Sequence, residues 1–263
     1  GDDKLYGDAD NDLIKGGDDN DLIQAGAGND TVDGGTGVDI INGEAGADTL
    51  DGGEGNDTVY GGTDDDTLLM SAGEDTINGG PGNDTLSFTK ASGSATFVMG
   101  TQTEAITIDQ SGFGQANDQK STAKNIENIT GSNHNDTFTG NDGINRIDGG
   151  KGDDTIIVSK GNDILDGGEG TDILTFKNAT TGATAVLNGA VSNNGFDESI
   201  STGNITHFEA MQGSTHNDTL TGEANKASTI YGSLGNDTLD GGSVTATDNT
   251  TFNTLSYAKL NDI

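Results

Sequence analysis

A nine-residue period runs through the first third of this chain. Written in rows of nine from Gly7, the sequence includes GGDDNDLIQ, GGTGVDIIN and GGEGNDTVY. The sixth position of every row is aspartate and the eighth is aliphatic, and both columns keep their register across ten rows. Repetition at a short fixed period is the signature of a solenoid, so this feature constrains the fold more than any other. The aspartate column contains Asp3, Asp12, Asp21, Asp30, Asp39, Asp48, Asp57, Asp66, Asp75 and Asp84.

Each row divides into a turn and a short strand. The last three positions place one aliphatic side chain between mostly polar neighbours, which predicts a three-residue strand with one inward side chain. The first six positions are glycine and small polar residues, which are typical of turns with positive φ. Two rows then make one circuit of about eighteen residues, and circuits stack about 4.8 Å apart as parallel strands. A helix does not fit a nine-residue aliphatic period with recurrent glycine, so we predict an all-β parallel solenoid.

Stacking places aspartates eighteen residues apart directly above one another. One edge of the solenoid carries the column that starts at Asp3, and the other edge carries the column that starts at Asp12. Like charges roughly 5 Å apart repel in a partly dehydrated groove, and a divalent cation between them reverses the sign of that interaction. Calcium fits best because it accepts six to eight oxygens, backbone carbonyls included, in irregular geometry. Magnesium requires a tighter octahedron, and zinc prefers histidine or cysteine.

The composition supports a fold that is completed by a cation. The 263 residues are only 29% hydrophobic and carry a formal charge of −33. Such a chain buries too little apolar surface to offset the entropy of ordering, so composition alone favours an acidic disordered chain. The regular spacing of the acids argues against disorder. The acidity makes nucleic acid a poor partner, and no apolar run is long enough for a transmembrane helix.

The rows match the consensus G-G-x-G-x-D-x-U-x, and the chain resembles the RTX (repeats-in-toxin) family of calcium-binding nonapeptide repeats. The resemblance covers residues 1–87 densely, 131–175 well and 213–240 in part. It implies a right-handed parallel β-roll, or β-helix solenoid, in which aspartates and turn carbonyls of adjacent circuits hold calcium. The turn glycines that it singles out as carbonyl ligands are Gly34, Gly35, Gly37, Gly52, Gly53, Gly55, Gly79, Gly80 and Gly82.

Some rows depart from the consensus. Asp10, Asp19 and Asp64 replace the second-half glycine, and because aspartate tolerates left-handed φ and adds charge, we expect these sites still to bind calcium. Met70-Ser71 replaces Gly-Gly, which puts that turn in doubt. Any single aspartate here could be a solvated turn residue; ten in register favour calcium ligands.

The repeat restarts twice. From Gly131, five rows place the acids Asp136, Asp154, Asp163 and Asp172 in the sixth position, while Asn145 replaces the acid of the second row and predicts a weaker site. A third region contains rows at 213–221 and 232–240, separated by a ten-residue row, and supplies Asp218 and Asp237.

Two spacers with similar sequences separate these blocks. We divide the chain into a first β-roll block (1–88), a spacer with extra strands (89–130), a second block (131–176), a spacer (177–212) and a partial third block with an insertion (213–263). The spacers leave the repeat through Leu86-Ser87-Phe88 and Leu174-Thr175-Phe176. They re-enter it through Ile126-Glu127-Asn128-Ile129-Thr130-Gly131-Ser132 and Phe208-Glu209-Ala210-Met211-Gln212-Gly213-Ser214. Leu255-Ser256-Tyr257 looks like a third exit. Flexible linkers are the alternative, but alternation and aromatic residues favour packed strands.

Catalytic motifs are missing from the sequence. There is no G-x-S-x-G, H-E-x-x-H or P-loop motif, and the many carboxylates are accounted for by the repeat, so we do not expect an enzyme. His134 and His216 occupy equivalent rows and fit turn positions better than zinc sites. A threonine rank at Thr31, Thr49, Thr67 and Thr85 is of the kind that can bind ice, but threonine also suits exposed strands.

Calcium is therefore the expected ligand, bound as multiple ions. The leading hypothesis is a calcium-dependent folding and spacing module of a large secreted bacterial surface protein, such as an adhesin or surface-layer component. The resemblance implies type I secretion, export in an unfolded state, and folding outside the cell. The alternatives are the C-terminal export region of a secreted toxin or hydrolase, or a polysaccharide- or ice-binding module. Other copies of the chain or a cell-surface ligand are candidate partners. Because residue 1 is glycine and no leader precedes the repeats, we expect a fragment of a longer protein.

Overall fold

The computed structural model describes residues 1–263 except 101–105, 110–119, 197–198, 201–203, 243–253 and 257–263. Every regular element in the described part is a β-strand, and no helix there is long and apolar enough to cross a membrane. The chain forms two compact units, Gly1–Asn135 and Asp136–Ile263.

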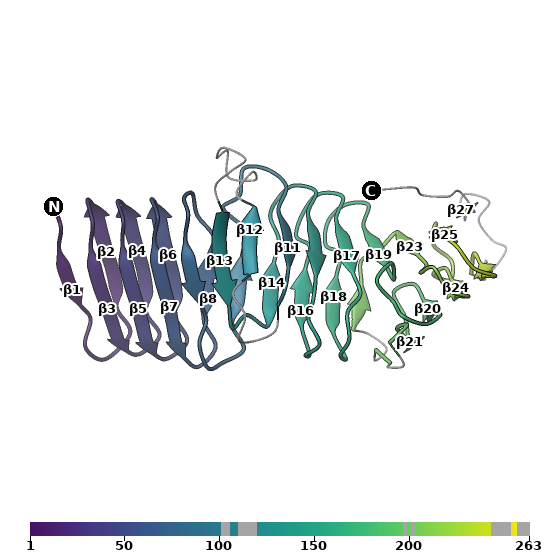
Figure 1. Ribbon diagram of the computed structural model, residues 1–263, viewed down its shortest axis with the longest axis horizontal. Helices are drawn as coiled ribbons and strands as arrows, with labels where there is room; N and C mark the ends of the chain where they lie inside the picture. The colour runs from purple at the N-terminus through teal and green to yellow at the C-terminus, as the bar shows by residue number, and fades with distance from the viewer. Residues whose placement is uncertain (101–105, 110–119, 197–198, 201–203, 243–253, 257–263) are drawn as a thin grey trace. The chain divides into compact units, whose positions relative to one another are not determined.

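The repeat rows of the first unit alternate between two parallel sheets (Figure 1). Val32 pairs with Leu50, and Leu50 pairs with Leu68, so each circuit takes eighteen residues as predicted. One sheet contains β1 (Lys4–Tyr6), β3 (Leu22–Ala27), β5 (Ile40–Ala45), β7 (Thr58–Thr63) and β9 (Thr76–Asn78). The other contains β2 (Leu13–Asp18), β4 (Thr31–Thr36), β6 (Thr49–Glu54), β8 (Thr67–Leu69) and β10 (Thr85–Ser87).

The aliphatic column forms the core of this unit. Ile23, Ile41, Leu50 and Leu68 have no exposed surface, while their neighbours at positions 7 and 9 are mostly partly or fully exposed. Each such side chain stabilises the fold by about 1.5–3 kcal/mol when fully buried. One inward aliphatic side chain per row makes a thin core. The buried polar atoms of the turns that border it must therefore also find partners.

The strands of the early rows are longer than predicted. β2 to β7 each contain six residues and continue through the glycine positions, where Gly17 pairs with Gly35 and Gly35 with Gly53. The expected three-residue strand is therefore wrong for these rows, because glycine permits close pairing where a larger residue would collide. β8 ends at Leu69, directly before Met70, whose fully buried side chain occupies the first position of its row, where most rows of this unit have glycine.

The first spacer returns to the two sheets. It contains β11 (Thr96–Val98), β12 (Ile106–Asp109), β13 (Lys120–Lys124) and β14 (Asn128–Thr130). β13 pairs in parallel with β9 and antiparallel with β12, and β14 pairs in parallel with β10. Phe88 and Phe97 pack with ring centroids 5.9 Å apart. Residues 120–130 therefore continue the solenoid.

The second unit is built from shorter strands. One parallel sheet contains β15 (Thr137–Thr139), β17 (Thr155–Ile157), β19 (Ile173–Thr175), β23 (Ala210–Gln212), β25 (Thr229–Tyr231) and β27 (Thr254–Ser256). A second contains β16 (Arg146–Asp148), β18 (Ile164–Asp166) and β22 (Ile205–Thr206). A third contains β20 (Thr184–Val186), β24 (Thr219–Thr221) and β26 (Thr238–Asp240), with β21 (Val191–Asn193) antiparallel to β20. Of the expected third exit, Leu255 and Ser256 lie in β27, and Tyr257 lies outside the described residues.

Candidate metal centres

The sixth-position aspartates stack in two ladders. In each ladder one carboxylate oxygen accepts a hydrogen bond from the backbone N–H of the sixth-position residue eighteen residues earlier, which is an aspartate except for Asn145. Asp30 Oδ1 accepts from Asp12 N at 2.8 Å, and Asp48 Oδ1 accepts from Asp30 N at 2.8 Å. The same bond recurs for Asp21, Asp39, Asp57, Asp66, Asp75, Asp84, Asp154, Asp163 and Asp172.

The other carboxylate oxygen is left without a protein partner in most rows. A buried unsatisfied polar atom costs about 1–3 kcal/mol, and more if it is charged. A proton or a bound cation would therefore stabilise these oxygens. The unpartnered Oδ2 atoms belong to Asp12, Asp21, Asp30, Asp39, Asp48, Asp57, Asp66, Asp84, Asp154 and Asp172.

Burial raises the pKa of many of these carboxyls because it disfavours the charged form, and neighbouring carboxylates add to the effect. The metal-free fold thus resists holding these charges at neutral pH. The pKa rises to about 6 for Asp48, Asp57, Asp84 and Asp172, to about 7 for Asp66 and Asp75, and to about 8 for Asp154.

Backbone carbonyls approach the unpartnered oxygens at the first position of each row. A Cβ added at Gly34 would lie 2.5 Å from Gly52 O and 2.6 Å from Asp39 Oδ2. Gly52 and Gly79 face the carboxylates of Asp57 and Asp84 in the same way. Glycine suits these rows because oxygens converge where a side chain would stand, whereas Ala25, Met70 and Val158 occupy the same position in their own rows.

At the second and fourth positions, the residue of each circuit lies directly against the backbone carbonyl of the equivalent residue one circuit earlier. Gly35, Gly53 and Gly80 have φ of 110°, 96° and 111°, and a Cβ on any of them would collide with the carbonyl one circuit earlier. Gly37 and Gly55 have φ of 137° and 140°, and Gly82 lies against Asp64 O. Asp10, Asp19 and Asp64 take φ of 80°, 77° and 80°, which confirms that aspartate adopts the left-handed conformation at these positions.

The second position decides whether the aspartate oxygen is open. All ten rows with an unpartnered Oδ2 have a residue with positive φ at this position, either glycine or, in two rows, Asp8 and Glu44. Serine at this position donates instead. Ser71 Oγ donates to Asp75 Oδ2 at 3.4 Å, and Ser159 Oγ donates to Asp163 Oδ2 at 3.0 Å.

The remaining predicted ligands are more varied. Ser214 N donates to Asp218 Oδ2 at 2.7 Å, and Ser233 N donates to Asp237 Oδ2 at 3.2 Å. Asp3 is exposed in the first row, and Asp136 is buried at the start of the second unit. Asn145 accepts from Asn141 N at 2.8 Å and brings no charge to its turn.

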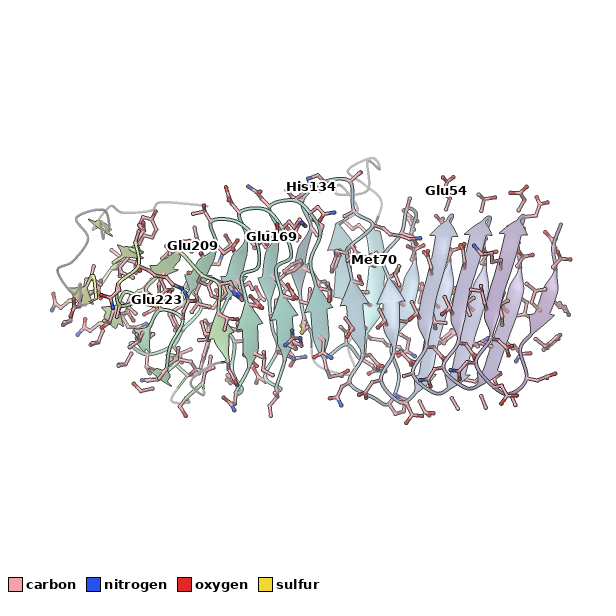
Figure 2. The ribbon with its side chains drawn as sticks, turned by 180° about the vertical axis from the view of Figure 1, so that it is seen from behind. Glu54, Met70, His134, Glu169, Glu209 and Glu223 are labelled. Atoms are coloured by element: carbon pink, nitrogen blue, oxygen red, sulfur yellow. The ribbon has the colours of Figure 1, made fainter. Side chains whose placement is uncertain are left out.

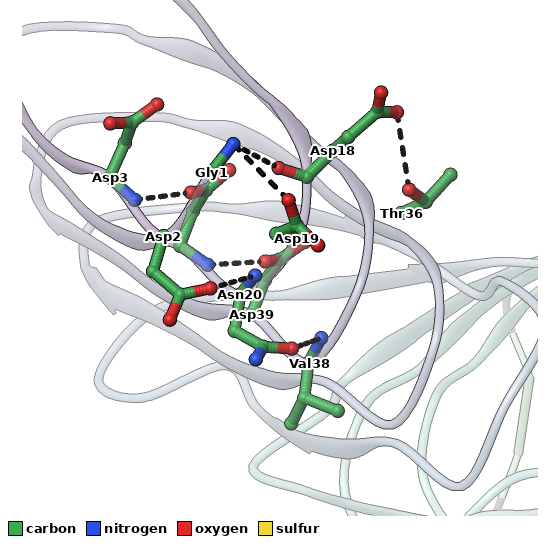
Figure 3. Close-up of polar contacts among 10 residues, drawn as sticks. Gly1, Asp2, Asp3, Asp18, Asp19, Asn20, Thr36, Val38 and Asp39 are labelled. Atoms are coloured by element: carbon green, nitrogen blue, oxygen red, sulfur yellow. Dashed lines mark hydrogen bonds and ion pairs between the residues drawn. The ribbon is translucent and has the colours of Figure 1, made fainter.

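A second ladder was not anticipated from the sequence. The fifth-position Asn20 Oδ1 accepts from Val38 N at 2.7 Å, and Asn20 N donates to Asp2 Oδ1 at 3.1 Å (Figure 3). Asn29 Oδ1 accepts from Ala47 N at 3.1 Å. This ladder runs opposite to the aspartate ladder, because here the later circuit donates. The recurrence of asparagine at position 5 was the signal in the sequence.

The donor set fits calcium. Every candidate ligand is a hard oxygen, either an aspartate carboxylate or a backbone carbonyl, and calcium accepts both. Within the described residues no group of three or more His, Cys, Asp or Glu side chains could hold a metal ion by itself. The candidate ligands are therefore single carboxylates of successive turns together with the turn carbonyls.

Comparison with known families agrees with this arrangement. The RTX calcium-binding nonapeptide repeat matches residues 1–32, 33–68, 71–88, 130–160, 139–174 and 212–244. No curated protein matches the chain. The family match covers more than half of the chain, and the stacked aspartate turns coincide with it. The chain therefore belongs to the RTX family and is a β-solenoid that binds multiple calcium ions through its nonapeptide repeats.

Proposed function

We propose that this chain is a calcium-dependent folding and structural module of a secreted bacterial surface protein, of the adhesin or surface-layer type. One observation carries the proposal: ten buried carboxylate oxygens of the sixth-position aspartates have no hydrogen-bond partner in the described part of the chain. Without a cation, these unpartnered oxygens destabilise the folded state. Calcium that binds only the folded state returns that free energy and drives folding.

The ligands that we propose for each calcium ion are the Oδ2 atoms of the aspartate ladder and the carbonyls of the first-, second- and fourth-position turn residues. Asp75, Asp163, Asp218 and Asp237 would contribute less, because serine already occupies one of their oxygens.

The charge of −33 supports a role linked to export. At low calcium, repulsion among the acids keeps the chain extended, which suits passage through a type I secretion channel. At the high calcium concentration outside the cell, the chain folds into a stiff solenoid that can hold neighbouring modules apart. We assign the chain no catalytic step, because its repeated carboxylates are held one by one in a ladder rather than paired across a cleft.

The test is a calcium titration of the chain at neutral pH, followed by far-ultraviolet circular dichroism. We expect a cooperative change from a coil spectrum to a β spectrum, and EGTA should reverse it. Magnesium and sodium chloride at matched ionic strength are the controls for charge screening, and neither should replace calcium. A β spectrum that persists in excess EGTA, or equal folding in magnesium, would contradict the proposal.

A further inference from the structure

Both spacers re-enter the solenoid through a shortened turn that lies outside the segments matched by the repeat family. In an ordinary row six residues separate position 9 of one strand from position 7 of the next. In the first unit Lys124 pairs with the position-9 residue Asn78, and Asn128 pairs with the position-7 residue Thr85, so only residues 125–127 form the turn. In the second unit the pairs Asp166–Thr206 and Ile173–Ala210 leave only residues 207–209.

The first residue of each shortened turn replaces a first-position glycine. Asn125 and His207 take left-handed φ of 52° and 56°. A Cβ at Gly79 would collide with Asn125 O, and one at Gly167 with His207 O, just as Gly34 faces a glycine carbonyl.

The side chains of these two residues hold the turns in place. Asn125 Nδ2 donates to Asn78 Oδ1 at 2.7 Å, and His207 Nδ1 lies 2.6 Å from Asp166 Oδ1. Both contacts are made to a position-9 residue of the preceding circuit. The two spacers thus place a carbonyl oxygen at equivalent positions of their turns, although the residue that carries it differs.

The last residue of each shortened turn replaces the ladder aspartate. Glu127 Oε2 accepts from Asp84 N at 2.8 Å, and Glu209 Oε2 accepts from Asp172 N at 2.8 Å (Glu209 is labelled in Figure 2). This is the bond that Oδ1 of an aspartate makes in every ordinary circuit. The extra methylene of glutamate extends the carboxylate to the ladder from a turn that is three residues shorter.

The aspartates whose N–H groups donate to these glutamates each keep one carboxylate oxygen without a partner. Asp84 and Asp172 are fully buried, and the Oδ2 atom of each has no partner. A contrasting case lies in the first spacer, where Ser121 Oγ accepts from Asp75 N at 2.7 Å. That position brings no charge, and Asp75 Oδ2 is already bound by Ser71.

We propose that each shortened turn completes a calcium site with the last aspartate of the preceding rows. Glu127 and the Asn125 carbonyl act with Asp84 in the first unit, and Glu209 and the His207 carbonyl act with Asp172 in the second. The inference rests on the proposed calcium-dependent function and deepens it. The spacers carry calcium ligands of their own and extend the ladder rather than interrupt it.

The experiment uses the full chain with Glu127→Gln, Glu209→Gln and the double variant. Glutamine keeps an oxygen that can accept the backbone hydrogen bond but removes the charge. Glu54→Gln and Glu169→Gln are matched controls, because these exposed third-position glutamates (labelled in Figure 2) remove the same charge from the same units. Calcium stoichiometry is measured by isothermal titration calorimetry with calcium chloride, and the folding midpoint by circular dichroism.

We expect each single variant to bind one calcium ion fewer than the wild type, the double variant to bind two fewer, and the controls to match the wild type. Unchanged stoichiometry and midpoint in both variants would overturn the inference. If a variant fails to fold, recovery at about tenfold higher calcium supports a lost ligand, and no recovery counts against it. A wild-type chain that does not fold with calcium would instead refute the proposed function.

Discussion

The two units satisfy their repeated aspartates differently. In the first unit, eight of the ten sixth-position aspartates keep an unpartnered Oδ2, whereas in the second only Asp154 and Asp172 do so. The second position of the row accounts for this difference. Residues with positive φ occupy it in the open rows, and Ser159, Ser214 and Ser233 occupy it in three rows of the second unit whose aspartate is bound internally.

The comparison teaches that a consensus aspartate alone does not define a calcium site. A left-handed residue at position 2 leaves the carboxylate open, and a serine closes it with a hydrogen bond from its N–H or hydroxyl. Hydrogen bonds to a charged group are worth about 1.5–3 kcal/mol, so a closed row gains less from calcium. We therefore expect the first unit to bind more ions per row and to depend on them more strongly.

The largest effect should appear when the metal-free chain is titrated with acid. The repeated aspartates with raised pKa, six in the first unit and two in the second, bind a proton more tightly when folded than at the usual value of 3.8. Their contribution to stability in EGTA is thus fully present below about pH 4 and is lost as the pH rises through about 6 to 8. Hydrogen exchange in EGTA should show acid-induced protection, and more of it in the first unit. Equal protection factors at pH 4 and pH 8, each corrected for the intrinsic exchange rate at that pH, would refute this.

The reverse dependence should hold at saturating calcium. Calcium competes with protons for the same oxygens, so acid should release the ions and weaken the holo fold. Running both titrations on the same sample separates the cation effect from general acid denaturation.

A smaller effect should separate an open row from a closed one. Asp48→Asn and Asp163→Asn each keep the Oδ1 acceptor and remove one buried charge. Asp48 has an open Oδ2, while Asp163 is bound by Ser159. We expect Asp48→Asn to lose one or two calcium ions and to raise the calcium midpoint, because each charged ligand weighs on affinity. Asp163→Asn should change the stoichiometry little. Equal losses in calorimetry would show that the second position does not control binding.

The opposite substitution should open a closed row. Ser159→Gly removes the hydroxyl that donates to Asp163 and restores the consensus glycine at the second position, so we expect the second unit to gain one calcium ion. Ser71→Gly is the matched change in the first unit, in the row that contains Asp75. It should add less, because the next circuit there presents Ser121 rather than a carboxylate. No gain in either variant would mean that the serine hydroxyl is not what closes the row.

The smallest effect belongs to the fifth-position ladder. Asn29→Ala and Asn217→Ala each remove one exposed acceptor, for Ala47 N in the first unit and Asn236 N in the second. We expect a loss of about 0.5–1.5 kcal/mol in the free energy of unfolding and an unchanged calcium stoichiometry. Denaturant unfolding at saturating calcium measures the first quantity, and calorimetry the second. A lost ion would assign this ladder to the metal sites.

The period of nine and its two columns were sufficient to predict the parallel solenoid, the eighteen-residue circuit, the aliphatic core and calcium as the ligand. These features repeat locally, so a single row contains the information and the repetition amplifies it. The strand length was not predictable in the same way. Glycine reads as a turn residue in isolation, and only the stacking of Gly17 on Gly35 and Gly53 makes those positions part of a strand.

The sites at the spacers depended on the tertiary structure. The similarity of the two re-entry segments is visible in the sequence, but their role depends on which strands they join. Glu127 meets Asp84 across 43 residues, and Glu209 meets Asp172 across 37. No fixed spacing relates these pairs, because the intervening chain varies in length. The pairing register of β13, β14, β22 and β23 places each glutamate in the ladder, and sheet register is a property of the folded chain rather than of a local motif.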